Sequence, residues 1–317
     1  MSKSVLSVFL LLAMAPLAGA QSLQNQVLGL LPVQTGEVSF LDVKALRGSP
    51  HYPQLKSQVL PERFRALVAW TQYIGIDFDA DVYQMSWAFL PPDEKGQPGL
   101  IGIAEGNFPL KELDAEIKKR RLTTTRHAGG TVLSLGKNDA GQEFVFAFVD
   151  GSTAVFGFRE LALEVLDRHA NGGQSLLNNR ELMDLVSQVN GKSPVWMAMD
   201  KRFTYLAVKQ MLPNLETLPG ADTVAQRLQS SILRFDLSSG MRSQGVVRTS
   251  DPTLVSTLVQ AGLAYQTWKI KEENPDLSRV LASMTVNRES DNVLLALSIS
   301  NDDLATLISK NSFALKF

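Results

Sequence analysis

The sequence predicts an α+β protein made of two related units, each an antiparallel-rich sheet covered by helices. Apolar residues alternate with a period of two in some segments and recur at helical spacing in others, and the two kinds of segment follow one another along the chain. The predicted order strand, helix, strand, strand, helix, strand, strand, helix occurs in residues 37–191 and again in residues 192–317. These ranges are the two predicted units.

Two explanations of the repeated order stay open. A diverged duplication of ferredoxin-like or related units would produce it. Independent convergence on alternating strands and helices would also produce it. The matched points are unevenly spaced, because Asp42 and Asp200 are 158 residues apart whereas Phe146 and Leu295 are 149 apart.

The first unit follows a lead-in of residues 21–36, which we expect to be loosely ordered. Its first strand is expected at residues 37–43. The alternation of residues 82–89 predicts a half-buried strand. The other expected elements are a helical region at 54–73 interrupted at Pro61, a strand at 100–105, a helix capped by Asn107 with Pro109 in its first turn, and a strand at 131–135.

The clearest local signal is the segment 143–158, in which two apolar runs flank Asp150-Gly151. Asp-Gly favours a hairpin turn because both residues can adopt positive φ. Both faces of this hairpin are apolar, so we expect it to be covered on both sides. Two helices should follow, one ended by Asn171-Gly172-Gly173 and one capped by Asn178 or Asn179 and stopped at Gly191.

The second unit is expected to begin with a strand at residues 194–200. The remaining expected elements are helices at 203–212 and 221–229 around a loop at 213–220, strands at 231–237 and 241–248 around a turn at 238–240, a helix opened by Ser250-Asp251-Pro252, strands at 279–286 and 293–299, and a last helix capped by Asn301.

The first twenty residues predict a cleaved secretory signal peptide. Lys3 supplies the positive start, residues 5–17 form an apolar stretch too short to span a bilayer, and Ala18-Gly19-Ala20 fits the cleavage pattern. The mature chain would start at Gln21 and be secreted or periplasmic, with no later transmembrane span. The chain has no cysteine. This excludes lipoprotein anchoring through an acylated cysteine, disulfide bonds, and catalysis or metal binding by a thiolate.

Composition narrows the classes of partner. The chain is 44% hydrophobic and 20% charged, which indicates an ordinary folded core. Its formal net charge is −1, and loss of Lys3 would make it −2. A net charge this close to zero gives no electrostatic reason to expect binding to nucleic acid or to an anionic membrane surface.

Asp77, Asp79 and Asp81 resemble the first three ligand positions of a calcium loop. The pattern ends there, because Val82 stands where the loop needs glycine and Ala88 where it needs glutamate. We interpret the segment as a solvated turn, although these carboxylates are the best available candidates for an acid or base.

The other motifs also have structural interpretations. Ser134 and Lys137 have serine-x-x-lysine spacing, but at a strand end instead of a helix start. His51, His127 and His169 are far apart in sequence, and His169 suits a helix C-terminus. Residues 171–175 fit a helix end better than an anion loop, and the basic run 118–121 fits a helix C-terminus. Residues 313–317 are interpreted as an edge strand or docked tail instead of a barrel signal.

Three local patterns together resemble uncharacterised secreted bacterial proteins grouped under domains of unknown function. They are a strand ending near Asp42, an Asp150-Gly151 hairpin followed by a helix containing Glu160-Leu161-Ala162, and Asn179-x-Glu181-Leu182 opening the next helix. The resemblance implies an exported α+β protein and supplies no catalytic, cofactor-binding or metal-binding residue.

The sequence thus favours an exported, soluble, non-catalytic protein that binds an unknown protein or small molecule in the periplasm or outside the cell. A secreted hydrolase with a site assembled from distant residues is one alternative. An envelope assembly factor is the other.

Overall fold

The computed structural model describes residues 23–49, 51–59, 62–93, 96–138, 140–211, 221–236, 240–272 and 275–310. The predicted signal peptide, the 213–220 loop and the 313–317 tail lie outside these residues. The chain divides into two compact units, here called the N-terminal unit (within 21–44 and 62–184) and the C-terminal unit (within 45–61 and 185–317). Residues 45–61 group with the C-terminal unit although they precede most of the N-terminal unit in sequence.

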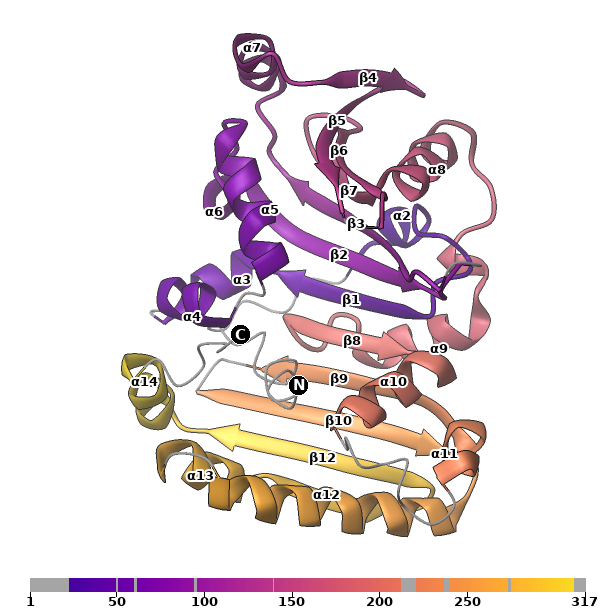
Figure 1. The fold of residues 1–317 in the computed structure, drawn as a ribbon, viewed down its shortest axis with the longest axis vertical. Coiled ribbons are helices and arrows are strands. Elements are labelled where there is room, and N and C mark those ends of the chain that lie inside the picture. The colour runs from indigo at the N-terminus through magenta and orange to yellow at the C-terminus, as the bar shows by residue number, and fades with distance from the viewer. Residues whose placement is uncertain are drawn as a thin grey trace. The chain divides into compact units, whose positions relative to one another are not determined.

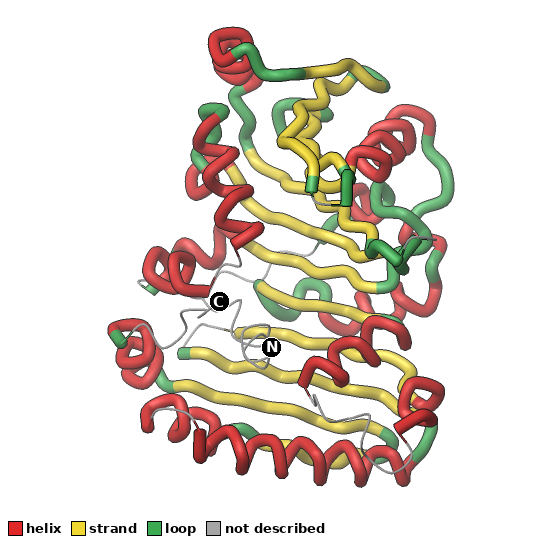
Figure 2. Tube along the Cα trace, viewed as in Figure 1, coloured by secondary structure: helices red, strands yellow, loops and turns green. Residues whose placement is uncertain are grey.

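The described residues form an α+β fold with twelve strands, seven in the N-terminal unit and five in the C-terminal unit (Figure 1; Figure 2). None of the described helices is both long and apolar enough to cross a membrane.

The N-terminal unit contains α-helices of 4 to 13 residues and strands of 4 to 9 residues. In chain order they are α2 (Asn25–Leu28), β1 (Glu37–Asp42), α3 (Val43–Arg47, which crosses into the C-terminal unit), α5 (Glu62–Tyr73), α6 (Phe78–Asp81), β2 (Val82–Leu90), β3 (Gly99–Gly106), α7 (Leu110–Arg120), β4 (Thr124–His127), β5 (Gly130–Lys137), β6 (Glu143–Phe148), β7 (Thr153–Phe158), α8 (Arg159–Asn171), the 3-10 helix η1 (Leu176–Asn178) and α9 (Arg180–Val189, which also crosses the boundary).

The sheet of this unit has the order β1-β2-β3-β7-β6-β5-β4, with every neighbouring pair antiparallel. The predicted hairpin of residues 143–158 is confirmed as β6 and β7. It lies inside the sheet, and Val145, Phe146, Ala147 and Phe148 are all buried. The apolar character of both faces therefore indicated its central position correctly.

The turn of that hairpin differs from the prediction. Neither Asp150 nor Gly151 has positive φ. Instead, Oδ1 of Asp150 accepts hydrogen bonds from the backbone N–H groups of Ser152 and Thr153 and from the Ser152 hydroxyl. Burial acts to raise the pKa of Asp150, but these hydrogen bonds outweigh it and lower the pKa. A side-chain-stabilised turn thus replaces the expected positive-φ turn.

The prediction of a loosely ordered lead-in is wrong for its described part. The side chains of Leu23, Val27 and Leu31 are buried. The backbone carbonyl of Leu31 accepts a hydrogen bond from the N–H of Leu176 at 2.8 Å. The segment is ordered by contacts with residues about 140 positions away, which no local pattern could reveal.

Residues 84–88 of β2 are buried on both faces, so the half-buried prediction is wrong for this part of the strand. Met85 and Trp87 are buried as expected, but Gln84 and Ser86 on the opposite face are buried too. The strand alternates apolar with polar because its second face carries buried polar groups, not because that face meets water.

Helices begin close to the predicted residues, with two differences in capping, at α7 and at the last helix. Helix α7 begins after Pro109, without a side-chain cap from Asn107. Asn179, not Asn178, caps α9 by accepting from the N–H of Leu182. The last helix is capped by Ser300, whose Oγ accepts from the N–H of Asp303, so Asn301 is its first residue. The helix end at Asn171-Gly172-Gly173 is confirmed, with φ of 75° at Gly172.

The C-terminal unit has the sheet order β8-β9-β10-β12-β11, again with antiparallel neighbours. Its elements are α4 (Tyr52–Val59), β8 (Val195–Met199), α10 (Lys201–Met211), α11 (Ala221–Arg227), β9 (Leu228–Asp236), β10 (Met241–Thr249), α12 (Pro252–Glu272), α13 (Pro275–Ala282), β11 (Thr285–Glu289), β12 (Asn292–Ile299) and α14 (Asn301–Ser309).

The strand predicted at residues 279–286 is wrong over its first part. Leu277, Val280 and Leu281 are buried on one face of α13, and Pro275 is its first residue. Proline at the first helical position and apolar residues three and four apart are the helix signals that we had missed.

Helix α12 runs along the sheet of the C-terminal unit (Figure 1). Its residues Leu254, Val255 and Leu258 pack in one buried cluster with side chains from four strands, among them Leu228 of β9. The strand members of that cluster include Val247 of β10, Val286 of β11 and Val293 of β12. The amphipathic pattern predicted for the start of this helix is therefore confirmed.

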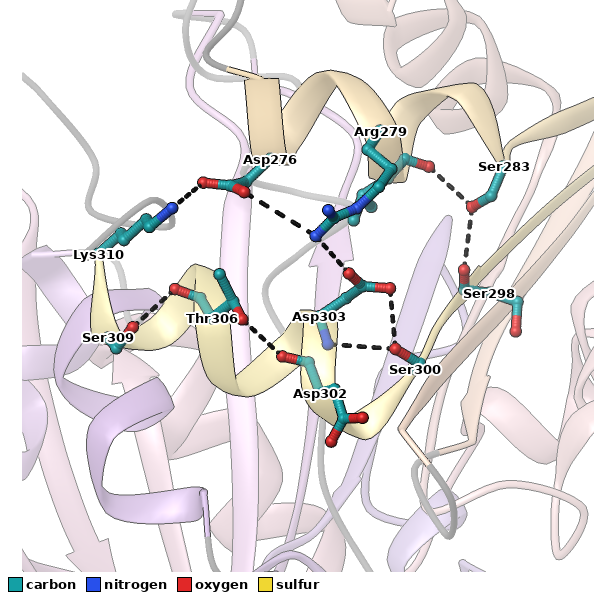
Figure 3. A network of polar contacts seen from close by, with 11 residues as sticks. Asp276, Arg279, Ser283, Ser298, Ser300, Asp302, Asp303, Thr306, Ser309 and Lys310 are labelled. Carbon is teal, nitrogen blue, oxygen red and sulfur yellow. Dashed lines mark hydrogen bonds and ion pairs between the residues drawn. The ribbon is translucent and has the colours of Figure 1, made fainter.

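A polar network joins α13 to α14 in the C-terminal unit (Figure 3). Arg279 lies 2.5 Å from Asp303 and 3.8 Å from Asp276, which also pairs with Lys310. Arg279 and Lys310 are more than half exposed, so each pair contributes little to stability alone. We interpret the network as structural, because it links the ends of two helices.

Five strands have the same order in both units. The order β1-β2-β3-β7-β6 matches β8-β9-β10-β12-β11 strand for strand, with helices at corresponding places after the first, third and last strands in chain order. The ferredoxin-like type is not confirmed, because split βαβ units pair parallel strands whereas the neighbouring described strands within each unit are antiparallel. The hairpin β4–β5 has no counterpart among the described strands of the C-terminal unit.

Candidate functional site

The three aspartates of the expected calcium-like segment support a short helix. Oδ1 of Asp77 caps α6 by accepting from the N–H groups of Asp79 and Ala80, and Oδ2 of Asp81 accepts from the N–H of Asp77. In the described part of the chain no group of three or more His, Asp or Glu side chains is placed to hold a metal ion. The carboxylates act here as local turn-forming groups.

The three histidines lie in different parts of the chain. His51 belongs to the C-terminal unit, whereas His127 is on β4 and His169 is on the last turn of α8, where it is exposed. Nε2 of His127 lies 2.8 Å from Oδ1 of Asp167, and both side chains are partly exposed. Sequence reasoning missed this pair, because its members are 40 residues apart.

The serine-x-x-lysine segment, the segment 171–175 and the basic run 118–121 have structural roles, as we predicted. Ser134 pairs with Val145 on the neighbouring strand, so it does not open a helix. Ser175 and Asn178 form a capping box at η1, next to the end of α8. The basic run 118–121 ends α7, with Lys119 and Arg120 each 2.8 Å from Glu116.

The edge strand β4 was not predicted, and it is the candidate functional site. It joins β5 through the two-residue turn Ala128-Gly129, which has φ of 45° and 84°. Positive φ at both central residues is typical of a type I′ turn, whose twist suits a tight hairpin. The strand escaped prediction because Thr124–His127 contains no apolar residue, so it shows no apolar alternation.

Helix α8 holds one face of β4. Nη2 of Arg159 donates to Oγ1 of Thr125 at 3.0 Å, and Asp167 contacts His127 as described above. Thr125 and His127 point to the same side of the strand, since side chains alternate. Two contacts from one helix, at the two ends of the strand face, therefore fix the position of β4.

The other long side of β4 carries unpaired backbone groups. The N–H of Ser134 donates to the carbonyl of Thr123 at 3.2 Å, and the register pairs Thr125 with Val132 and His127 with Gly130. In an antiparallel pair only alternate residues bond to the partner strand. The N–H and C=O groups of Thr124 and Arg126 must therefore point away from β5.

No described strand pairs with that side of β4, which is the outermost strand of the sheet (Figure 1). The side chains of Thr124 and Arg126 are exposed. We call the outward side of residues 124–127 the β4 edge. An open edge of this kind can add a further strand from another chain.

A second polar feature lies in the interior of the same sheet. Asp42, Gln84 and Glu105 occupy neighbouring register positions on β1, β2 and β3. Nε2 of Gln84 donates a short hydrogen bond to Oε2 of Glu105. Burial raises the pKa of Glu105, although the hydrogen bond from Gln84 opposes this shift.

Gln84 of this polar row and Ser86, two residues further along β2, have spare hydrogen-bonding capacity. Oε1 of Gln84 and Oγ of Ser86 are buried and accept no hydrogen bond from the described residues. Buried polar atoms of native proteins usually have a partner. The row therefore suits a group that donates hydrogen bonds.

Comparisons with protein-family models, curated proteins and solved structures find no match. The resemblance to secreted proteins grouped under domains of unknown function stays a prediction.

Proposed function

We propose that the chain is an exported, non-catalytic protein that binds a partner protein through the β4 edge. The observation that carries the proposal is the pair of outward backbone positions, Thr124 and Arg126, on a strand that is fixed from the other side. A strand whose position is already fixed loses little conformational freedom when a partner binds.

The difference between the two units supports a special role for the β4–β5 hairpin. Five strands in the same order are enough to build the sheet of the C-terminal unit, whereas the N-terminal unit extends its sheet by this hairpin. An addition that the common order does not need is a natural place for a binding function. The shared order also supports a diverged duplication, which we propose as the origin of the two units.

Export to the periplasm or the outside of the cell rests on residues 1–20. The positive start, the short apolar stretch and the Ala18-Gly19-Ala20 pattern favour cleavage before Gln21. The absence of cysteine means that an oxidising compartment would not form disulfides in this chain.

Position-specific photo-crosslinking in cells of the native host tests the proposal. A crosslinking amino acid replaces Thr124 on β4 or, as the matched control, Thr285 on β11, which is the outer strand of the C-terminal unit. Both threonines are exposed and lie on outer strands. We expect a discrete protein adduct from position 124 and none from position 285. Equal patterns at both positions, or no adduct at 124, would contradict the proposal.

Binding of a small molecule is a second candidate, favoured by the polar row of Asp42, Gln84 and Glu105. The buried acceptors Gln84 Oε1 in this row and Ser86 Oγ beside it on β2 would pair with donor groups of a ligand. Native mass spectrometry of the purified full chain tests this candidate, because a retained ligand adds a fixed mass. Loss of that mass in Gln84→Leu, but not in the surface variant Gln142→Leu, would support it.

The hydrolase alternative has one supporting contact, the pair of His127 and Asp167. An imidazole oriented by a carboxylate is the general-base part of many hydrolase sites. Ester, peptide and glycoside panels with His127→Ala test it, since a catalytic base would abolish any activity found. Co-purification of outer-membrane proteins would instead favour an envelope assembly factor.

A further inference from the structure

We infer that the partner of the β4 edge presents an acidic, extended segment that adds to the sheet as a further strand. The inference rests on the proposed function and specifies the chemistry of the partner. Its basis is the combination of free backbone groups with a local excess of positive charge.

The backbone groups define the geometry of binding. Thr124 and Arg126 each offer one N–H and one C=O on the open side of β4, two residues apart. An added strand presents the complementary groups at the same spacing, so about four to six residues of an extended peptide cover the edge. A loop or a helix cannot pair with this side, because its own backbone groups do not repeat every second residue in a line.

Charge selects among extended segments. Residues 118–126 contain five basic residues and no acidic one, and all five are exposed: Lys118, Lys119, Arg120, Arg121 and Arg126. Lys119 and Arg120 pair with Glu116. None of the ion pairs found among the described residues includes Lys118, Arg121 or Arg126. An acidic strand would therefore meet uncompensated cations near the edge.

The same charges disfavour a second copy of this chain as the occupant. Two β4 strands pairing edge to edge would bring two Arg126 side chains and their neighbouring cations together. Like charges opposite one another on paired strands are destabilising. Basic residues on an edge strand also discourage self-association in general.

Two substitutions separate the backbone contribution from the charge contribution. Thr124→Pro removes an outward N–H and leaves both the charge and the bonds to β5 in place, since proline is tolerated where its nitrogen faces solvent. Arg126→Glu reverses a charge and leaves every backbone group in place. Arg288→Pro, at an outward backbone position of the outer strand β11, and Arg242→Glu, on the C-terminal sheet, are the matched controls.

The experiment measures fluorescence anisotropy of three labelled, end-capped peptides with the full-length mature chain. The peptides are (Glu-Val)3, (Lys-Val)3 and (Glu-Pro)3, of which the last is acidic but cannot form a strand ladder. We expect binding of (Glu-Val)3 only, weakened by salt. Thr124→Pro and Arg126→Glu should each lower its affinity roughly tenfold or more, and the two controls should leave it unchanged.

Amide hydrogen exchange of the complex gives the second readout. Bound (Glu-Val)3 should protect the N–H groups of Thr124 and Arg126. Binding that Thr124→Pro does not weaken, or equal binding of (Lys-Val)3 or (Glu-Pro)3, would overturn the inference. Specific crosslinks from position 124 without binding of (Glu-Val)3 would overturn the acidic-strand chemistry alone, whereas absence of both would overturn the proposed function as well. Concentration-dependent dimers abolished by Thr124→Pro would identify a second copy as the occupant and so contradict the inference.

Discussion

Oδ1 of Asp167 lies 2.8 Å from Nε2 of His127, and this contact joins helix α8 to the edge strand β4. The second link between the same elements is the hydrogen bond from Arg159 to Thr125. Because the sheet supports β4 on one long side only, these two contacts explain how a four-residue strand without apolar side chains keeps its place.

Breaking the histidine link should loosen β4 without unfolding the unit. We expect His127→Ala to lower the free energy of unfolding by only about 0.5–1 kcal/mol, because the pair is partly exposed. Amide exchange of Thr125 should rise several-fold by NMR. Asp167→Asn keeps an acceptor oxygen and is the matched control. A loss of several kcal/mol in His127→Ala would mean that the pair has a wider structural role than we describe.

Gly157 should be the least replaceable residue of the central hairpin. Its φ is 148°, and a Cβ there would lie 2.4 Å from the carbonyl oxygen of Leu100, a backbone atom of the neighbouring strand. We expect Gly157→Ala to destabilise the chain by about 3 kcal/mol or more in urea unfolding. Gly151→Ala, which meets nothing closer than 3.7 Å and needs no positive φ, is the control and should cost less than about 1 kcal/mol. Similar costs for the two variants would contradict this packing.

Stability should depend on pH through Glu105. Burial raises its pKa above the ordinary value of 4.5 in the folded state, so the folded chain binds this proton more tightly than the unfolded chain. The resulting stabilisation is complete below the unfolded pKa and is lost as pH rises through the folded pKa. Glu105→Gln, which keeps an acceptor for Gln84, should therefore be more stable than the parent at pH 7.

The comparison of thermal unfolding at pH 4 and pH 7 checks this assignment. The advantage of Glu105→Gln should shrink at the lower pH. Glu112→Gln changes an exposed glutamate of α7 and is the control, for which we expect no such dependence. A Glu105→Gln variant that is less stable than the parent at pH 7 would show that the charged form of Glu105 is the stabilised one.

Export predicts a defined mature N-terminus. Mass spectrometry of the chain recovered from the host envelope or medium should give a protein that starts at Gln21, because Ala18-Gly19-Ala20 fits the cleavage pattern. Replacing Ala18 and Ala20 with bulky residues should block processing. An intact Met1 on chain recovered from the cell interior would contradict export.

The sequence predicted elements whose stabilising contacts are local. The β6–β7 hairpin and α8 were visible because apolar residues of Phe144–Phe158 change from a period of two to helical spacing at Arg159. Helix α13 was not predicted, although Pro275 and Leu277 are local signals of a helix. The segment from Val280 to Val286 also fits the pattern of a strand, and this second pattern led to the wrong prediction.

Elements that depend on distant partners could not be predicted. The lead-in is ordered by the bond of Leu31 to Leu176, and β4 is defined by its pairing with β5 and by contacts from α8. The candidate site follows from that pairing, since a polar segment such as Thr124–His127 has an open edge only once its neighbours are known.

Amide hydrogen exchange of the free, full-length chain tests the central claim most directly, because it reports whether the β4 edge is open. We predict an alternating pattern by NMR, with fast exchange at the N–H groups of Thr124 and Arg126 and slow exchange at those of Thr125 and His127. Slow exchange at Thr124 and Arg126 in the free chain would show that the edge is already paired, and would contradict a partner site there.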